Sequence, residues 1–117
     1  MTGLFQETQQ NSAPLNASFV LEDALDRNGW QPQMTLLNAE LALKGKPTYT
    51  YLLRPSEIGR GFAIAFVELS GSVKHDYFRL INPKYGIFRQ GMPTHVGQLE
   101  KVIRDMMHCQ MHEGAPL

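Results

Sequence analysis

The sequence predicts an α+β domain in which a small central antiparallel sheet is flanked by two helices. Three runs with the composition of strands lie at 48–54, 61–69 and 72–81. Short turns join them, and short connections favour antiparallel pairing because a parallel pair needs a long crossover. A helical pattern precedes the strands at 34–45, and another follows them at 92–110. One helix can then cover each face of the sheet.

The helix expected at 34–45 has recognisable boundaries. Thr35 can cap its start, its residues are strong helix formers, and Gly45 favours its end. Pro47 prevents the helix from continuing. Upstream, "SFVLEDALDRNGW" carries apolar residues at helical spacing and is compatible with a further short helix.

The strands and the last helix follow from the same kind of pattern. "YTYLL" is aromatic, β-branched and apolar, "EIGRG" and "SG" are turns, and Ile87 with Phe88 can begin a short fourth strand after the turn "NPKYG". The last helix has Thr94 near its start. Its apolar residues form one stripe, at positions 96, 99, 102, 103, 106 and 107.

Length and composition limit the function classes. With 117 residues and 43% apolar residues, the chain predicts one packed domain at 17–112, a loose arm at 1–16 and a tail at 113–117. Basic and acidic residues balance at 11 each, which argues against binding nucleic acid by bulk charge. No apolar run reaches the ~18 residues that a membrane span needs, and the N-terminus lacks the features of a signal peptide. One cysteine, Cys109, allows no internal disulfide, which fits a reducing compartment, so we expect the protein in the cytoplasm. We also expect a monomer.

The first strand ends in an arginine whose position demands an explanation. Arg54 lies where the chain should still be buried or nearly so, and a guanidinium without a partner is costly to bury. Ser56 points to the same side because side chains alternate along a strand. The turn from Glu57 to Gly61, with Arg60 between two glycines, offers backbone amides that can form an anion-binding nest.

Neighbouring strands extend this constellation. Ala63 and Ala65 are small and leave room on one face of the sheet, and the third strand supplies Lys74 and His75. These residues predict a basic hollow with space for a flat ring. The alternative is that Arg54 pairs internally with a carboxylate, for which Glu57 and Glu40 are available, as an arginine in a strand more often does.

The set as a whole resembles an SH2 domain, the phosphotyrosine-binding module. "TYLLRPSE" resembles the family's F-L-V-R-E-S strand, "SVKHDYFRL" resembles its V-K-H-Y-R-I strand, and the last helix is similar to F-x-S-L-x-x-L-V-x-x-Y. Trp30 resembles the tryptophan that opens the domain. The resemblance covers roughly residues 30–108.

This resemblance implies a function and a set of site residues. The phosphate would bind Arg54, Ser56 and the loop from Glu57 to Gly61, and the ring would lie against His75 and the third strand. A deep arginine is reached by phosphotyrosine but not by the shorter phosphoserine. We therefore expect a phosphotyrosine-binding module that docks on tyrosine-phosphorylated peptides or proteins, with no cofactor and no catalytic activity.

Three departures from the family pattern affect the details. The second arginine that many members carry on the first helix is replaced here by Leu36 or Leu37, and Arg60 is a candidate substitute. "HDYF" has one residue more than the family strand, so Tyr77 is included as a site candidate. Only seven residues follow Gln110, while 89–95 can fold over the ligand, so we expect little selectivity for flanking residues. Compact SH2 domains of this kind resemble those of bacterial effectors, which act in the host cytosol.

Other readings of the sequence were an SH2-like scaffold without phosphate binding, a metal site and a cysteine nucleophile. His108, Cys109 and His112 lie close together, but their spacing and number are poor for zinc. Cys109 has no partner in the order that a cysteine catalytic centre requires. The strand aromatics could stack nucleic-acid bases, yet core packing explains them more simply. We expect no metal, no nucleic acid and no membrane among the partners.

Overall fold

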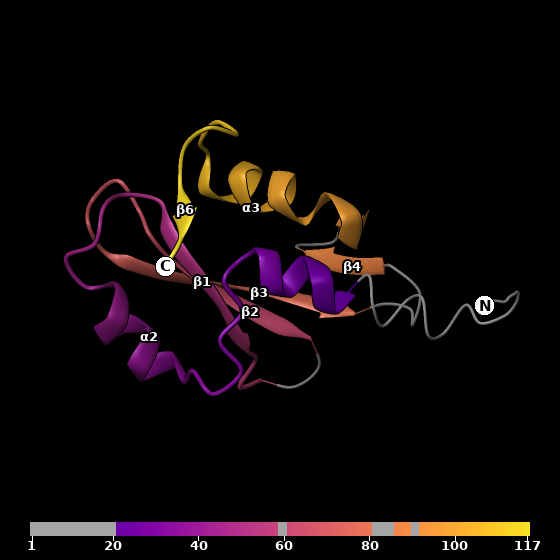
Figure 1. Ribbon diagram of the computed structural model, residues 1–117, viewed down its shortest axis with the longest axis horizontal. Coiled ribbons are helices and arrows are strands. Elements are labelled where there is room, and N and C mark those ends of the chain that lie inside the picture. The colour runs from indigo at the N-terminus through magenta and orange to yellow at the C-terminus, as the bar shows by residue number, and fades with distance from the viewer. Residues whose placement is uncertain (1–20, 59–60, 81–85, 90–91) are drawn as a thin grey trace, which may run out of the picture.

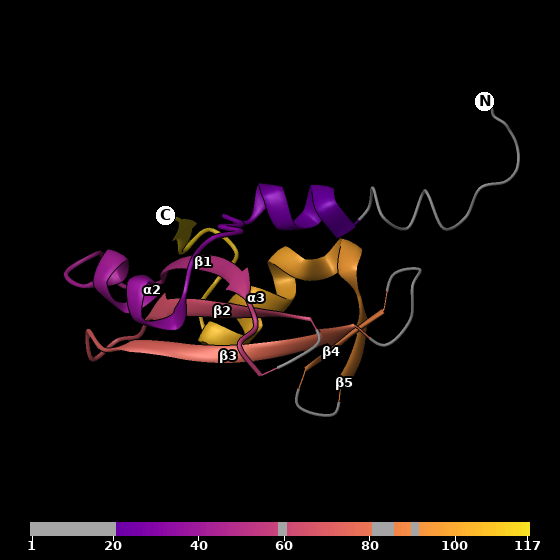
Figure 2. The same ribbon diagram turned by 90° about the horizontal axis from the view of Figure 1, so that it is seen from below.

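A single mixed sheet is the centre of the computed structural model, which describes residues 21–58, 61–80, 86–89 and 92–117 (Figure 1). The spatial order of its strands is β5-β4-β3-β2-β1-β6. The strands are β1 (Thr50–Pro55), β2 (Phe62–Val67), β3 (Val73–Leu80), β4 (Gly86–Arg89), β5 (Met92–His95) and β6 (Ala115–Pro116). Figure 2 shows β1, β2 and β3 side by side, with β4 and β5 at the far end of β3. The three predicted strands are present, each within two residues of its expected ends.

Helices cover both faces of this sheet, as predicted. α2 (Leu36–Leu43) packs on one face through Ala39 and Leu43, against a small core that includes Leu52 and Ala65. α3 (Leu99–Met107), preceded by the 3₁₀ turn η1 (Val96–Gln98), packs on the other. Figure 1 shows α2 and α3 on opposite sides of the strands. The further short helix is also present at 21–27 and shares the larger core with α3.

The helix ends follow local chemistry. The Thr35 side chain accepts a hydrogen bond from the Asn38 backbone N–H at 3.1 Å and caps α2, as expected. α3 begins later than the sequence pattern indicated, because residues 92–95 pair with β4 as β5. Thr94 is therefore a strand residue, and Gln98 stands at the N-cap without a side-chain cap bond. No helix within the described part of the chain is long and apolar enough to cross a membrane.

The segment expected as a tail at 113–117 instead adds β6 to the sheet. Thr50 pairs with Ala115 and Tyr51 with Pro116, in parallel rather than antiparallel orientation. A parallel pair needs a long connection between its strands. Here the connection from β1 to β6 contains β2, β3, β4, β5 and α3. The arm expected at 1–16 lies outside the described residues.

A buried arginine ties α3 to the segment that leads into β6. Arg104 is 9% exposed, and its guanidinium donates to the Tyr51 hydroxyl at 3.0 Å and to the backbone oxygens of Glu113 and Gly114, each at 3.2 Å. The Tyr51 hydroxyl in turn donates to the Asn28 side-chain oxygen at 3.0 Å. This network joins the end of helix 21–27, β1, α3 and the β6 segment, and it holds β6 on the edge of the sheet.

Candidate functional site

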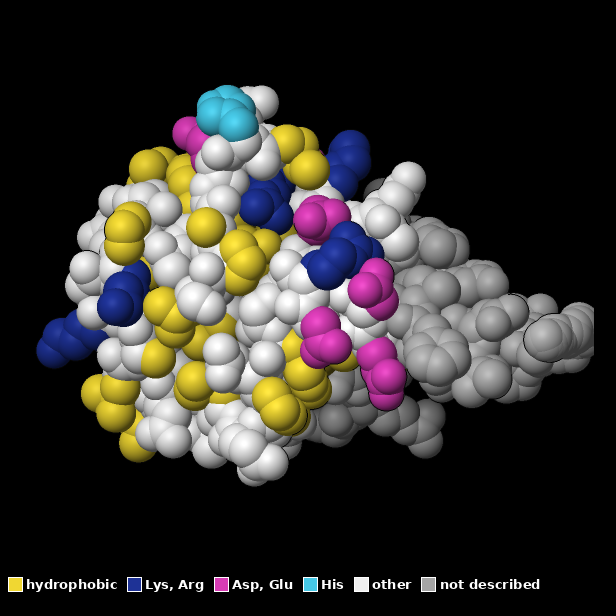
Figure 3. All heavy atoms as spheres, in the orientation of Figure 1, with side chains coloured by type: hydrophobic (Ala, Val, Ile, Leu, Met, Phe, Trp, Pro, Cys, Tyr) yellow, Lys and Arg dark blue, Asp and Glu magenta, His cyan; other side chains and the backbone are white. Residues whose placement is uncertain are grey.

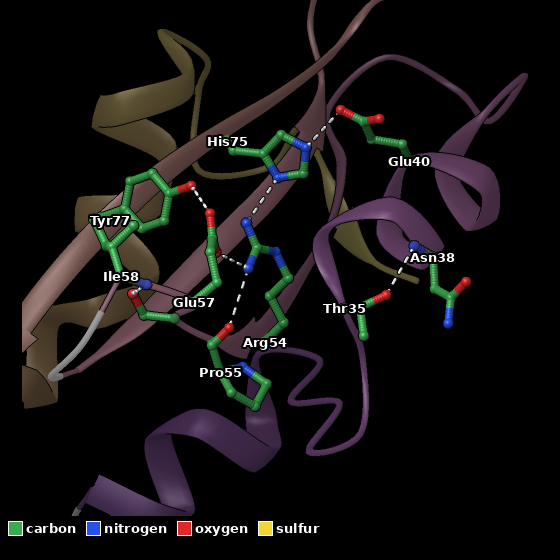
Figure 4. A network of polar contacts seen from close by, with 10 residues as sticks. Thr35, Asn38, Glu40, Arg54, Pro55, Glu57, Ile58, His75 and Tyr77 are labelled. Atoms are coloured by element: carbon green, nitrogen blue, oxygen red, sulfur yellow. Dashed lines mark hydrogen bonds and ion pairs between the residues drawn. The ribbon is translucent and has the colours of Figure 1, made fainter.

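Arg54 is the most deeply buried charged group among the described residues, with 0% of its surface exposed. It lies near the end of β1, where it pairs with Ala63 of β2 and faces the same side of the sheet as α2. Its Nη1 donates to Glu57 Oε1 at 2.6 Å and to the Pro55 carbonyl oxygen at 3.1 Å. Its Nε is buried and has no hydrogen-bond partner among the described residues. Figure 4 shows how these groups converge.

Glu57 bridges Arg54 to the third strand. One carboxylate oxygen accepts from Arg54, and the other accepts from the Tyr77 hydroxyl at 2.6 Å. The hydrogen bonds from Tyr77 and Arg54 lower the pKa of Glu57 from 4.5 to about 2, whereas the bond to Glu57 raises the pKa of Tyr77. Arg54 also lies over the Tyr77 ring, 5.8 Å from its centroid. Both oxygens of the Glu57 carboxylate are therefore engaged as acceptors.

His75 connects Arg54 to α2. Arg54 Nη2 lies 3.1 Å from His75 Nδ1, and His75 Nε2 lies 3.0 Å from Glu40 Oε2. Because a guanidinium nitrogen can only donate, Nδ1 must accept, and Nε2 must carry the proton that is donated to Glu40. The imidazole is thus neutral and of defined tautomer in this arrangement. The chain Glu40–His75–Arg54–Glu57 contains two carboxylates and one fixed cation.

The structure brings together several of the residues predicted from the sequence. Arg54, Glu57, His75 and Tyr77 are in direct contact, and Glu40, named as an internal partner, joins them. Ala63 and Ala65 lie on the same face and are fully buried, so the space over Ala65 is occupied by the core beneath α2 rather than open.

Ser56 and Gly61 shape the turn rather than contact Arg54. The Ser56 side-chain oxygen accepts from the Ile58 backbone N–H at 3.2 Å. Gly61 has φ +94°, and a Cβ there would collide with the Phe78 backbone, so only glycine lets the turn approach β3 this closely. Arg60 lies outside the described residues.

Lys74 does not join the cluster. Side chains alternate along β3, so His75 and Tyr77 face Arg54 while Lys74 points to the opposite face, where its partner in register is Phe66. There it lines a cavity of about 510 Å³ between the sheet and the end of α3, together with Asp76, Asp105 and Met106. Adjacent residues of a strand project to opposite faces, so Lys74 and His75 do not both face Arg54.

The alternative sites at the end of α3 gain little support. His108 takes the left-handed conformation at the C-cap, and within the described part of the chain no three His, Cys, Asp or Glu side chains gather as metal ligands do. Burial raises the pKa of the Cys109 thiol, which is the opposite of what activates a nucleophile. The face in Figure 3 mixes acidic and basic side chains. Arg27 pairs with Asp23 at 2.9 Å and with Glu100 at 3.2 Å, and a surface of mixed charge is not what a nucleic-acid backbone selects.

Comparison with known proteins identifies the architecture. No family model and no curated relative matches the sequence. Among solved structures, the chain is similar to the SH2 domain of the CRK/CRKL homologue of Monosiga brevicollis, with a TM-score of 0.57 and 19% identity over 77% of this chain and 83% of that one. It is also similar to CED-2, with a TM-score of 0.59 and 16% identity over 92% of this chain, which spans 62% of CED-2. Together with the helices on both faces of the sheet, these similarities show that the chain has an SH2-like fold.

Proposed function

We propose that the chain is a phosphotyrosine-binding module. The observation that carries the proposal is Arg54, a buried guanidinium whose Nη1 donates to the half-exposed Glu57 carboxylate and whose Nε has no hydrogen-bond partner among the described residues. A planar guanidinium matches two oxygens of a phosphate, and phosphotyrosine brings about −1.5 to −2 charges at neutral pH. His75 and Tyr77 on β3 supply the wall against which a ring would lie.

Depth gives the selectivity for tyrosine. The Arg54 side chain is only 1% exposed, whereas Glu57, which lies over it, is 42% exposed. The guanidinium that the phosphate must contact therefore lies below the surface of the domain. The long, rigid side chain of phosphotyrosine reaches this depth, and the short side chain of phosphoserine does not.

Selectivity for the residues around the phosphotyrosine is proposed to be weak. The residues after α3 turn back at once, since the Gln110 backbone N–H donates to Glu113 Oε1 at 2.8 Å. They then pair with β1 as β6, at the edge of the sheet. β3, which carries His75 and Tyr77, lies on the other side of β1 and β2 from this edge. This segment does not reach a ligand held against β3. A steep preference for one side chain at a fixed distance from the phosphotyrosine, in a phosphopeptide library, would contradict this part of the proposal.

The proposed module acts by docking, without catalysis, on tyrosine-phosphorylated peptides or proteins, as a monomer. Its ligand is made where tyrosine kinases act, so its proposed compartment is the cytosol. If the chain is a bacterial effector, that compartment is the host cytosol.

The decisive experiment compares one peptide in its phosphotyrosine, phosphoserine and unmodified forms by fluorescence anisotropy. We expect only the phosphotyrosine form to bind. Arg54→Ala should weaken binding at least ~100-fold, equivalent to ~2.7 kcal/mol. Lys74→Ala is the matched control, because it also removes one positive charge from this region but on the opposite face of β3. It should change the affinity by less than ~2-fold, since its charge is exposed to solvent.

A second candidate function is an SH2-like scaffold in which Arg54 serves only an internal ion pair. The observation that favours it is the 2.6 Å contact between Arg54 and Glu57. The same binding experiment separates the two, because a scaffold binds no form of the peptide while remaining fully folded. An equal loss of binding in Lys74→Ala and Arg54→Ala would also contradict the proposed site.

A further inference from the structure

Arg54 is inaccessible in the arrangement described above. Its side chain is 1% exposed and is covered by Glu57, His75 and Tyr77, which it contacts directly. No anion from outside can reach its guanidinium unless one of these groups moves. A binding function for Arg54 therefore requires a defined displacement.

Glu57 is the group best placed to move. It lies in the turn after β1, outside the sheet ladder, and its side chain is 42% exposed, so its carboxylate can rotate into water without disturbing the pairing of the strands. His75, in contrast, lies within β3, is 12% exposed and is held from behind by Glu40. Tyr77 lies in the same ladder, opposite Ala63.

We infer that the Glu57 carboxylate is an internal competitor that occupies the position of two phosphate oxygens on Arg54 and Tyr77, and that phosphotyrosine binds by displacing it. This inference rests on the proposed function. Glu57 Oε1 accepts from Arg54 Nη1, and Oε2 accepts from the Tyr77 hydroxyl. A phosphate monoester can take over both contacts, and its third terminal oxygen remains available as an acceptor.

Charge decides the competition. The cluster of Glu40, Arg54 and Glu57 carries one positive and two negative charges around a neutral His75. A dianion that entered without expelling Glu57 would meet a net negative site. Because Glu57 is tethered beside Arg54, its effective concentration is on the order of millimolar or higher. A carboxylate from another protein offers the same group with no such advantage, so Glu57 excludes acidic peptides and admits the more highly charged phosphate.

The test measures the affinity of one phosphotyrosine peptide for the wild-type chain, Glu57→Gln and Glu57→Ala. Glu57→Gln keeps the shape but removes the charge, and should tighten binding at least ~10-fold. Glu57→Ala should tighten it by at least as much. The matched control is Glu100→Gln, a glutamate with 47% side-chain exposure that also pairs with an arginine but lies on α3. It should change the affinity by less than ~2-fold.

A second control separates displacement from the local field. Glu40→Gln removes a negative charge from the same cluster, but Glu40 contacts His75 and not Arg54. If Glu40→Gln tightens binding as much as Glu57→Gln, the local potential and not the displacement of Glu57 sets the affinity, and the inference is overturned. It is also overturned if the wild-type chain binds phosphotyrosine and Glu57→Gln binds equally or more weakly, an outcome that leaves the proposed function intact.

A failure of the proposed function gives a different result from a failure of the inference alone. If neither the wild-type chain nor either Glu57 variant binds phosphotyrosine, the function and the inference fall together. If only the Glu57 variants bind, both are supported and the competitor blocks the site completely. An independent readout is the pKa of the Glu57 carboxyl group, followed by NMR through the chemical shift of its carboxyl carbon. This pKa should rise from about 2 toward its ordinary value when peptide is added to saturation. An unchanged value with bound peptide would show that Glu57 has not been displaced.

Discussion

Replacing Arg54 by methionine should remove phosphotyrosine binding without lowering the stability of the fold. Methionine is unbranched and fills irregular space, so it can occupy the volume of the arginine stem. The variant thus tests whether Arg54 is retained for a ligand or for the fold. A ligand arginine is dispensable for folding, whereas a structural ion pair is not.

The expected magnitude follows from the contacts of Arg54. Its pair with the half-exposed Glu57 contributes up to ~1 kcal/mol. Its contacts with Pro55 O and His75 contribute ~1 kcal/mol each. Against these stand two costs: the buried Nε, which has no partner among the described residues and costs ~1–3 kcal/mol, and the desolvation of the charge itself. The terms cancel or favour methionine, so the free energy of unfolding should stay equal or rise by ~1–2 kcal/mol.

Removing one member of a buried ion pair is usually damaging because the other charge stays buried. Here the partner is 42% exposed and can be hydrated where it stands. Urea unfolding, followed through the fluorescence of the single tryptophan Trp30, which bridges to Leu53 of β1, measures the difference directly. A loss of more than ~2 kcal/mol with an unchanged slope would refute the reasoning and favour the scaffold function, because it would exceed every term assigned to a dispensable arginine.

Three further predictions follow from the same structure. Because the folded pKa of Glu57 is depressed to about 2, its stabilising contribution is complete above its ordinary pKa and is lost as the pH falls toward 2. Glu57→Gln should therefore be less stable than wild type by ~1 kcal/mol at pH 7, after allowance for solvent screening. Acid unfolding curves should show this difference in stability vanishing near pH 2. Gly61→Ala should cost at least ~2 kcal/mol of unfolding free energy in urea, because its Cβ meets the Phe78 backbone at a positive φ; a neutral result would mean that the turn is not held against β3. Tyr51→Phe should lower the melting temperature by several degrees, since a buried N–H of Arg104 and a buried amide oxygen each lose a partner worth ~1–3 kcal/mol; calorimetry showing no change would exclude this network as a source of stability.

The fold was predictable from the sequence to the extent that it rests on local pattern. Alternating and continuous apolar runs, bounded by turn residues, identified β1, β2 and β3, and the capping residue Thr35 identified α2. Two elements have no comparable local signal. β6 contains only two residues, and the hydrogen bond from Arg104 to Gly114 holds the chain that leads into it beside β1. β5 ("MPTH") has the composition of a helix start, and only its pairing with β4 makes it a strand.

The site was predictable only in part, for a different reason. Arg54 and His75 were assigned to one cluster, and they do make contact. The pleat of β3 was a usable signal that would have excluded Lys74, because adjacent strand residues cannot share a face. The partnership of Glu40 with His75 joins residues 35 positions apart, and no spacing rule predicts it. Whether Glu57 or a ligand neutralises Arg54 depends on a side-chain orientation that sequence pattern does not contain.

The two arginines that are buried among the described residues, Arg54 and Arg104, differ in their partners. Arg104 donates to a tyrosine hydroxyl and to two backbone carbonyls, and it stacks on the Tyr51 ring at 5.2 Å. These acceptors are neutral and belong to the folded framework, so nothing from outside can replace them. Arg54 instead contacts an exposed carboxylate on a turn, and its Nε has no partner among the described residues. A fold that needed Arg54 only for its stability would gain by satisfying that nitrogen, as it satisfies Arg104. Arg54 is instead neutralised by an exposed carboxylate on a turn, which an external anion can replace without disturbing the strands.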